Sequence, residues 1–533
     1  MKKITIIAAL FFAYTAVAQD KRPDNWFNLD HTKDNVNGVS TEKTYEELLK
    51  GRKSKTIIVG VLDSGVDYKH EDLKDVMWTN PGEIPDNGID DDKNGYIDDI
   101  HGWNFMGNKD GSNVAKDNLE LTRVYKGLKA KYDGKKEEEL KTKDEKKEYK
   151  YYLAVKADYE KELNDAEAQM NQVKFIKTAL DGMIEKIKKE QGVEKVTMAN
   201  IDKFDAKDQK DKQAKMIAKS VVASGTSLDD LMDQLKEAEE QLDVSARYDL
   251  NSDTRSIVGD NYNDVNERYY GNNDCKGPGA FHGTHVAGII AAKRGNGVGM
   301  DGIAADVKIM SVRCVPDGDE RDKDVANAIR YAVDNGAQII NMSFGKKYSP
   351  NKKAVDDAIK YAQSKGVLLI HAAGNDGEDI DEITHYPCKK FENSKKEASN
   401  FMDVGALSWK PDDKIAAPFS NYGKKTVDLF APGVDIYSTV PENKYKDASG
   451  TSMAAPVVAG VAAVLKSYFP ELTPEQMKKI LMKSARTEYK DKKVIKPGTK
   501  DELVEFGDLS KTGGIINLYE AIKMAESMVK VKG

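Results

Sequence analysis

Short, wholly apolar runs separated by turns recur in two parts of the chain, residues 55–112 and 254–525. The run at 56–62 (TIIVGVL) is typical of a strand that is buried on both faces. Similar runs occur at 307–312, 339–342 and 367–370. These segments predict the strands of a parallel sheet, because strands of that kind read as continuous rather than alternating hydrophobic runs.

Amphipathic stretches lie between these runs. Residues 325–333 and 354–362 carry apolar side chains at helical spacing, and the second stretch is followed by Gly366, a good C-cap. Strands and helices in alternation predict an α/β fold: a mostly parallel sheet with helices on both faces.

The segment 113–253 has a different pattern. It contains no proline, tryptophan or cysteine, and lysine and glutamate dominate it. Apolar residues recur at steps of three and four through 152–173 and 228–242, and Ser227 precedes the second stretch as an expected N-cap. We predict an inserted all-α, coiled-coil-like subdomain. The alternative, a disordered charged linker, fits only residues 135–150.

The first residues are typical of a targeting signal. Two lysines precede a short apolar run at 4–14, and an A-x-A cleavage site follows at 16–18. The alternative is an uncleaved anchor, but the run is short for spanning a bilayer. We therefore expect a signal peptide at 1–18 and an exported protein, periplasmic or extracellular, with no transmembrane anchor after cleavage. Residues 19–54 are then an N-terminal extension, and 526–533 a C-terminal tail.

Composition excludes some functions. The 533 residues carry a formal net charge of −7, which gives no electrostatic footprint for nucleic acid. The three cysteines, Cys275, Cys314 and Cys388, allow at most one internal disulfide, and none lies in a recognisable nucleophile motif.

Three short segments place a reactive side chain at a turn. VLDSGVD puts Asp63 at the carboxyl end of a predicted buried strand, where open α/β sheets build their sites. HGTHVAG puts His282 ahead of an apolar helix, and SGTSMAAP puts Ser452 at the start of another. Free N–H groups at a helix N-terminus favour developing negative charge, so a nucleophilic oxygen is well placed there.

Together, in the order Asp, His, Ser, these segments resemble the subtilisin-like serine peptidases (subtilases) over about 330 residues. The resemblance implies a serine endopeptidase with Asp63, His282 and Ser452 as its catalytic triad, and with Asn375 of HAAGN in the oxyanion hole. It also implies protein or peptide substrates, and no cofactor required for the chemistry.

The same resemblance implies which residues bind the substrate backbone: Ser343, Phe344 and Gly345 of IINMSFG, with Ala372, Ala373 and Gly374. Phe344 stands where the family usually has leucine. These segments contribute no charge to the pocket that they wall, so we expect a lean toward apolar side chains. Tyr386-Pro387 resembles a family turn that often contains a cis peptide bond.

An acidic segment, DNGIDDDKNGYIDD, resembles the opening of a calcium loop. Asp90, Asp92 and Asn94 stand at alternate positions, and Asp98 follows. A full EF-hand would place glutamate where His101 stands, so we expect a looser loop holding a structural Ca²⁺. The alternative is a solvated acidic turn.

Two features depart from the family. Only 37 residues separate Ala18 from Thr56, too few for the usual folded prodomain. The insertion between the Asp63 and His282 segments is the other departure. We hypothesise that it controls access to the active site or recruits protein substrates, and a spacer or oligomerisation arm is the alternative.

Other functions fit the sequence less well. A catalytically latent subtilisin-fold protein, binding or scaffolding through its helical arm, would not need the triad and the asparagine together. A sedolisin would use Glu and Asp in place of the His–Asp pair. A lipase would carry a G-x-S-x-G elbow, which Ser452 lacks, and its serine would come first in the chain.

Overall fold

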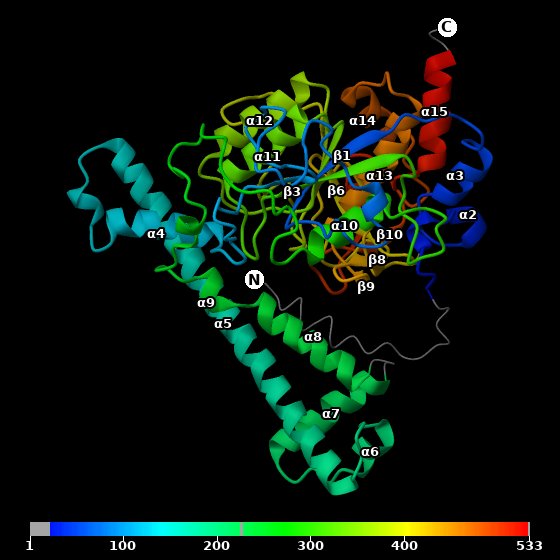
Figure 1. Ribbon diagram of the computed structural model, residues 1–533. Helices are drawn as coiled ribbons and strands as arrows, with labels where there is room; N and C mark the ends of the chain where they lie inside the picture. Colours follow the sequence, from blue (N-terminus) through cyan, green and yellow to red (C-terminus); the bar gives the residue numbers. More distant parts are fainter. Residues whose placement is uncertain (1–21, 224–226, 531–533) are drawn as a thin grey trace. The chain divides into compact units, whose positions relative to one another are not determined.

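The computed structural model describes residues 22–223 and 227–530, which form two compact units (Figure 1). The larger unit comprises Arg22–Glu120 and the chain from Asp253 onward, and the smaller unit is Leu121–Ser252. Residues 22–54 and 113–120, which the sequence patterns set apart from the α/β core, lie in the larger unit. The predicted signal peptide, 1–18, lies outside the described residues.

A parallel sheet of seven strands runs through the larger unit, in the order β2-β3-β1-β4-β5-β6-β7. Every neighbouring pair is parallel, and nearly every strand residue is buried, as continuous apolar runs predict. The strands are β1 (Ile57–Asp63), β2 (Gly102–Asn104), β3 (Val307–Arg313), β4 (Ile339–Met342), β5 (Leu368–Ala372), β6 (Phe401–Leu407) and β7 (Leu429–Pro432). The predicted α/β subtilisin-like fold is confirmed.

Successive strand residues pack into two separate cores, because side chains alternate between the faces of a sheet. Ile309 and Ile339 belong to one core, whereas their chain neighbours Met310 and Ile340 belong to the other. The first core packs against α10 (Phe281–Ala291), α13 (Thr451–Tyr468), α14 (Pro474–Lys483) and α15 (Leu518–Lys530). The second packs against α11 (Asp322–Asp334) and α12 (Lys352–Ser364). Both faces of the sheet are therefore covered by helices (Figure 1).

Helix α13 is the central helix of the first core. Among the described residues it alone is long and apolar enough to cross a membrane, and 83% of its residues are buried inside the unit. Its composition is therefore accounted for by the core in which it lies.

The N-terminal segment is an integral layer of the larger unit. It contains η1 (Trp26–Asn28), α2 (His31–Asp34) and α3 (Thr41–Glu47), and Trp26 and Phe27 are fully buried in the first core. The backbone N–H of Leu518 donates to the carbonyl of Val39 at 2.9 Å, which ties the segment to the start of α15.

Smaller elements complete the larger unit: two antiparallel hairpins, β8 (Ile436–Val440) with β9 (Lys444–Ala448) and β10 (Lys493–Ile495) with β11 (Leu503–Glu505), and the single turns η2 (Lys74–Val76), η4 (Thr254–Ile257) and η5 (Phe506–Asp508).

The smaller unit is helical: α4 (Glu120–Tyr132), η3 (Glu137–Glu139), α5 (Lys143–Gln191), α6 (Met198–Lys203), α7 (Gln209–Ala223), α8 (Leu228–Gln241) and α9 (Val244–Arg247). Helix α5 is 49 residues long, begins at a capping box on Thr142 and ends at the left-handed Gly192. Ser227 caps α8 with Asp230, as predicted. Apolar residues of α5 bury against α7 and α8 in a core of their own.

Candidate active site

Asp63 and His282 lie in direct contact. Asp63 ends β1, and His282 occupies the first turn of α10; His282 Nδ1 lies 2.8 Å from Asp63 Oδ1. Asp63 is 1% exposed, and the same oxygen accepts the backbone N–H of Ser64 at 2.7 Å. Burial lowers the pKa of His282, but the charge and hydrogen bond of Asp63 outweigh it, so that pKa is raised above its usual value.

A glycine allows this contact. A Cβ on Gly283 would lie 2.2 Å from the carbonyl oxygen of Gly65 and 3.1 Å from Asp63 Cβ. Any larger residue would therefore push the first turn of α10 away from the loop that follows β1. The glycine of the HGTH motif thus sets the distance between the histidine and the carboxylate.

Ser452 lies in the first turn of α13, opposite Ser343. Pro456 has no N–H to donate to the carbonyl of Ser452 four residues earlier. The hydroxyl of Ser343 donates to that carbonyl instead, at 2.9 Å. The Ser452 hydroxyl in turn donates to the carbonyl of Ser343 at 3.1 Å. Within the described part of the chain, no hydrogen bond joins the Ser452 hydroxyl to His282.

Asn375 and the start of α13 border one small space. The side-chain Oδ1 of Asn375 accepts the backbone N–H and the hydroxyl of Thr451, each at 2.9 Å, which leaves its Nδ2 as the outward donor. A Cβ on Gly450 would lie 3.4 Å from Asn375 Nδ2 and 3.5 Å from the backbone nitrogen of Ser452. Asn375 Nδ2 and the backbone N–H of Ser452 therefore flank a small space that a side chain at position 450 would fill.

The six residues expected to bind substrate backbone come from neighbouring strands. Residues 343–345 follow β4, whereas 372–374 end and follow β5, and the register pairs Met342 with His371. The carboxyl ends of the two parallel strands therefore bring both segments to the same edge of the sheet. Gly374 adopts a φ of +102°, and a side chain there would clash with Asn421 Nδ2 at 2.4 Å.

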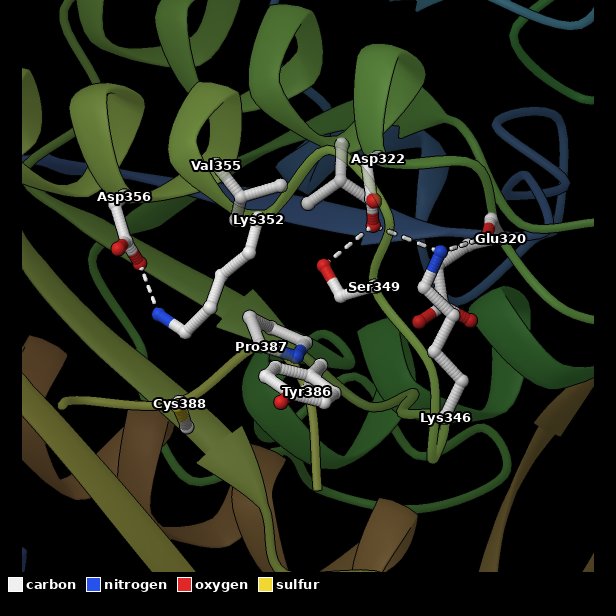
Figure 2. Close-up of a pocket in the computed structure, with 11 residues that line it drawn as sticks. Glu320, Asp322, Lys346, Ser349, Lys352, Val355, Asp356, Tyr386, Pro387 and Cys388 are labelled. Atoms are coloured by element: carbon white, nitrogen blue, oxygen red, sulfur yellow. Dashed lines mark hydrogen bonds and ion pairs between the residues drawn. The ribbon is translucent and has the colours of Figure 1, made fainter. Parts of the chain in front are cut away.

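The segment after Gly345 is anchored by backbone and by charge. Lys346 exchanges two backbone hydrogen bonds with Tyr386, at 2.9 and 2.8 Å, and the Tyr386-Pro387 bond is cis, in line with the family turn. The buried Lys346 ammonium lies 2.8 Å from Glu120. It also lies 2.8 Å from Asp322 and donates to the carbonyl of Glu320 (Figure 2). Figure 2 shows this cluster beside the small pocket that Tyr386 and Pro387 line.

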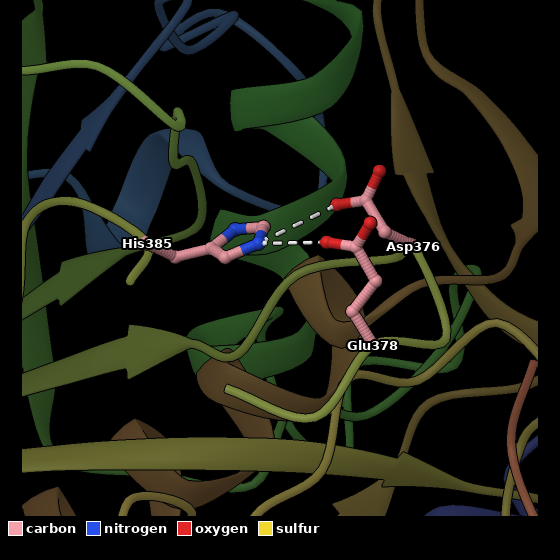
Figure 3. Close-up of side chains that lie close together, drawn as sticks. All are labelled: Asp376, Glu378 and His385. Atoms are coloured by element: carbon pink, nitrogen blue, oxygen red, sulfur yellow. Dashed lines mark hydrogen bonds and ion pairs between the residues drawn. The ribbon is translucent and has the colours of Figure 1, made fainter. Parts of the chain in front are cut away.

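Charged groups lie next to Gly374, which the sequence did not indicate. His385 Nε2 lies 3.3 Å from Glu378 and 3.9 Å from Asp376 (Figure 3). Burial raises the pKa of Glu378, but hydrogen bonds from His385 and Lys347 outweigh it and lower that pKa to about 2. A Cβ on Gly374 would lie 3.4 Å from His385 Nδ1. Segments 343–345 and 372–374 carry no charge themselves, but residues 376–385 bring charge close to them.

The predicted calcium loop brings together carboxylates that only partly match the predicted ligands. Carboxylate oxygens of Glu83, Asp90 and Asp92 lie within 4.8 Å of one another, a donor set that suits a hard cation. Glu83 was not among the candidates. Asp98 instead accepts the backbone N–H groups of Asn87 and Gly88 at 3.2 and 2.8 Å.

Asn94, the remaining predicted ligand, and its buried neighbour Asp99 also belong to this loop. The Asn94 amide donates to Asp92 at 3.2 Å and to Asp99 at 3.1 Å. Asp99 is fully buried, and burial raises its pKa to about 7 despite hydrogen bonds from Tyr331, Asn80 and Asn94. The carboxylates that come together therefore fit Ca²⁺ by their chemistry.

The cysteines take no part in this site. Cys275, Cys314 and Cys388 are all free thiols, and burial is the main cause that raises the pKa of each. A thiolate nucleophile needs the opposite shift.

A family model matches most of the chain, and individual relatives match shorter parts of it. The model of the subtilase family matches residues 54–507. The thermophilic serine proteinase of Bacillus sp. (strain AK1) is 43% identical over 187 residues, which make up 35% of this chain and 42% of that protein. Subtilisin DY of Bacillus licheniformis is 35% identical over 209 residues, or 39% of this chain and 71% of that protein. The solved prenylagaramide maturation protease PagA aligns with a TM-score of 0.36 and 30% identity, over 46% of this chain and 82% of that one.

The first of these relatives is matched over less than half of its own length. The family model, by contrast, spans the segments that contain Asp63, His282, Asn375 and Ser452. The predicted family is confirmed: the chain belongs to the subtilase family.

Proposed function

We propose that the chain is a serine endopeptidase that hydrolyses peptide bonds of proteins through an acyl-enzyme. The observation that carries the proposal is the 2.8 Å contact between His282 Nδ1 and the buried Asp63. Because Nδ1 donates to the carboxylate, Nε2 is the nitrogen left to accept a proton. Such a pair supplies the general base that a serine nucleophile requires.

Ser452 is the nucleophile in this proposal. Its hydroxyl donates to the carbonyl of Ser343 in the structure, so attack requires the side chain to rotate toward His282. His282 then takes the hydroxyl proton as Ser452 Oγ bonds to the substrate carbonyl carbon. Asp63 holds the imidazole in the required tautomer and stabilises the imidazolium. His282 next gives the proton to the leaving amine as the peptide C–N bond breaks, which leaves the acyl-enzyme. Water then attacks the acyl carbon with His282 as its base, and the acid is released as Ser452 regains its proton.

The oxyanion of the tetrahedral intermediate occupies the space beside Gly450. Asn375 Nδ2 and the backbone N–H of Ser452 border that space, and both belong to groups that are already fixed. Fixed donors stabilise developing charge without reorganising during the reaction, which makes this contribution large.

The substrates are proteins or peptides, and the protein acts outside the cytoplasm. Two relatives, a thermophilic serine proteinase and a cell wall-associated protease of Bacillus subtilis, support the first statement, and the second relative alone supports the location. A structural Ca²⁺ bound by Glu83, Asp90 and Asp92 would neutralise their mutual repulsion and brace the loop at 80–99. It would take no part in peptide hydrolysis.

The test is hydrolysis of casein and of a chromogenic peptide by the purified protein, beside Ser452→Ala. Ser467→Ala is the matched control, because Ser467 lies in the same helix and its hydroxyl donates to the carbonyl of Val464, within that helix. We expect activity in the wild type and the control and none in Ser452→Ala. A folded but inactive wild type would overturn the proposal and favour a binding module.

A further inference from the structure

Behind the segment 343–345, the ring of His371 meets a hydrogen-bond acceptor at each nitrogen. Nδ1 lies 2.8 Å from Asp403 Oδ1, and Nε2 lies 2.9 Å from the carbonyl oxygen of Phe344. His371 is 2% exposed and Asp403 3% exposed. The sheet register accounts for the contact with Asp403, because His371 of β5 stands directly opposite Asp403 of β6. Residues opposite each other on parallel neighbours project from the same face.

Two acceptors require two donors. A backbone carbonyl and an ionised carboxylate only accept, whereas a neutral imidazole has a single N–H. Burial raises the pKa of Asp403, but the charge of Lys389 and the hydrogen bond from His371 outweigh it, and the net shift is downward. Nε2 of His371 therefore donates to the carbonyl of Phe344, and a proton lies between Nδ1 and Asp403.

A buried ion network holds the ring of His371 in place. Lys389 Nζ lies 3.2 Å from Asp403 Oδ2 and 2.8 Å from Asp428 Oδ2. Lys478 Nζ lies 3.2 Å from Asp428 Oδ1 and is the most exposed member, at 15%. The other side chains of the network are at most 5% exposed. Removing one partner from such a buried network leaves an unpaired charge, which is strongly unfavourable.

The bond to Phe344 fixes the direction of a neighbouring donor. In a trans peptide the C=O and the following N–H point to opposite sides. With the carbonyl of Phe344 directed inward to His371, the N–H of Gly345 is directed outward, toward the side on which a substrate chain would lie. On its other side, Ser343 exchanges two hydrogen bonds with Ser452.

We propose that His371, held in place by Asp403, is a positioning residue of the active site, which turns the Phe344–Gly345 peptide so that the Gly345 N–H binds the backbone carbonyl of an extended substrate. The inference rests on the proposed endopeptidase function and deepens it. The Gly345 N–H binds the substrate chain and not the reacting atoms. Its loss therefore weakens the binding of extended peptides more than it slows the reaction with small reagents.

The experiment compares the wild type with His371→Leu, which cannot donate a hydrogen bond, and with His70→Leu. His70 is also fully buried in the larger unit, but it bonds to the carbonyl of Lys444, far in sequence from residues 343–345. Two readouts are measured: kcat/KM for a tetrapeptide anilide, and the rate of Ser452 labelling by a small fluorophosphonate. We expect His371→Leu to lose about 10- to 100-fold in kcat/KM, mostly through KM, with labelling nearly unchanged. His70→Leu should change neither.

A second variant and a spectrum cover the case in which His371→Leu does not fold. In Asp403→Asn the amide donates to Nδ1, so Nε2–H still binds Phe344, and peptide hydrolysis should stay within about 10-fold of the wild type. ¹⁵N-histidine NMR should show a proton on Nε2 of His371 in the wild type and in Asp403→Asn.

Equal losses in labelling and peptide hydrolysis, or none in either, would overturn the positioning role. A His371 that lacks a proton on Nε2 in the wild type would overturn the bond to Phe344. If the wild type neither labels nor cleaves, the proposed function fails and the positioning role with it, whereas the NMR spectrum still decides the protonation of His371.

Discussion

Ser343 and Ser452 exchange two hydrogen bonds: the hydroxyl of each donates to the backbone carbonyl of the other, at 2.9 and 3.1 Å. The first bond exists because Pro456 cannot supply the helical N–H that the carbonyl of Ser452 would otherwise receive. A proline within α13 thus links the predicted nucleophile to the predicted substrate-binding segment.

Loss of the Ser343 hydroxyl should leave that carbonyl without a donor. We expect Ser343→Ala to lower the free energy of unfolding by about 1–3 kcal/mol, measured by urea denaturation. In the background of Pro456→Ala, which restores an N–H, the same substitution should cost less. A double-mutant cycle that gives strict additivity would contradict this account.

Asn375 should act on the transition state rather than on substrate binding. We expect Asn375→Ala to lower kcat by about 10²–10³-fold, the loss that follows removal of one oxyanion donor in related enzymes, with little change in KM. Steady-state kinetics on a peptide anilide measures both. A change confined to KM would place Asn375 in binding instead.

The pH dependence of activity follows from the raised pKa of His282. Only the neutral imidazole accepts a proton from Ser452, so kcat/KM should rise with pH and reach half its maximum above the usual histidine value of about 6.5. Asp63→Asn removes the carboxylate charge, so its acid limb should move to lower pH while kcat falls by about 10⁴-fold. An acid limb that stays at the same pH in Asp63→Asn would show that another group titrates.

Calcium should stabilise the loop in which Glu83, Asp90 and Asp92 meet. We expect about 1 mM Ca²⁺ to raise Tm by a few degrees over EDTA-treated protein, because a ligand that binds only the folded state stabilises it. Asp92→Asn should abolish the increase. Asp110→Asn is the control, since Asp110 bonds only within its own turn in the structure, to Ser112. An unchanged Tm in the wild type would mean a solvated acidic turn.

Candidate residues that stand in short local motifs could be picked out from the sequence. Asp63, His282, Ser452 and Asn375 each stand in a local motif next to a strand end or a helix start, so their types and neighbours could be recognised. The parallel sheet was predictable for the same reason, because each buried strand is a continuous apolar run.

Residues that act through the register of distant strands were not predictable. His371 and Asp403 lie 32 positions apart, and only the β5–β6 pairing brings them together. The Glu83 carboxylate joins the acidic loop by accepting the backbone N–H groups of residues 91, 92 and 98, which spacing along the sequence does not reveal. Burial of Trp26 and Phe27 depends on α15 and on the β8–β9 side of the unit, which no local pattern around residue 26 reveals.

The most direct test of the central claim is to label the purified protein with a fluorophosphonate and to map the adduct by mass spectrometry. The account predicts one adduct, on Ser452, that is absent in Ser452→Ala, nearly absent in His282→Ala and retained in Ser467→Ala. An adduct on another serine, or no adduct on folded wild-type protein, would contradict it.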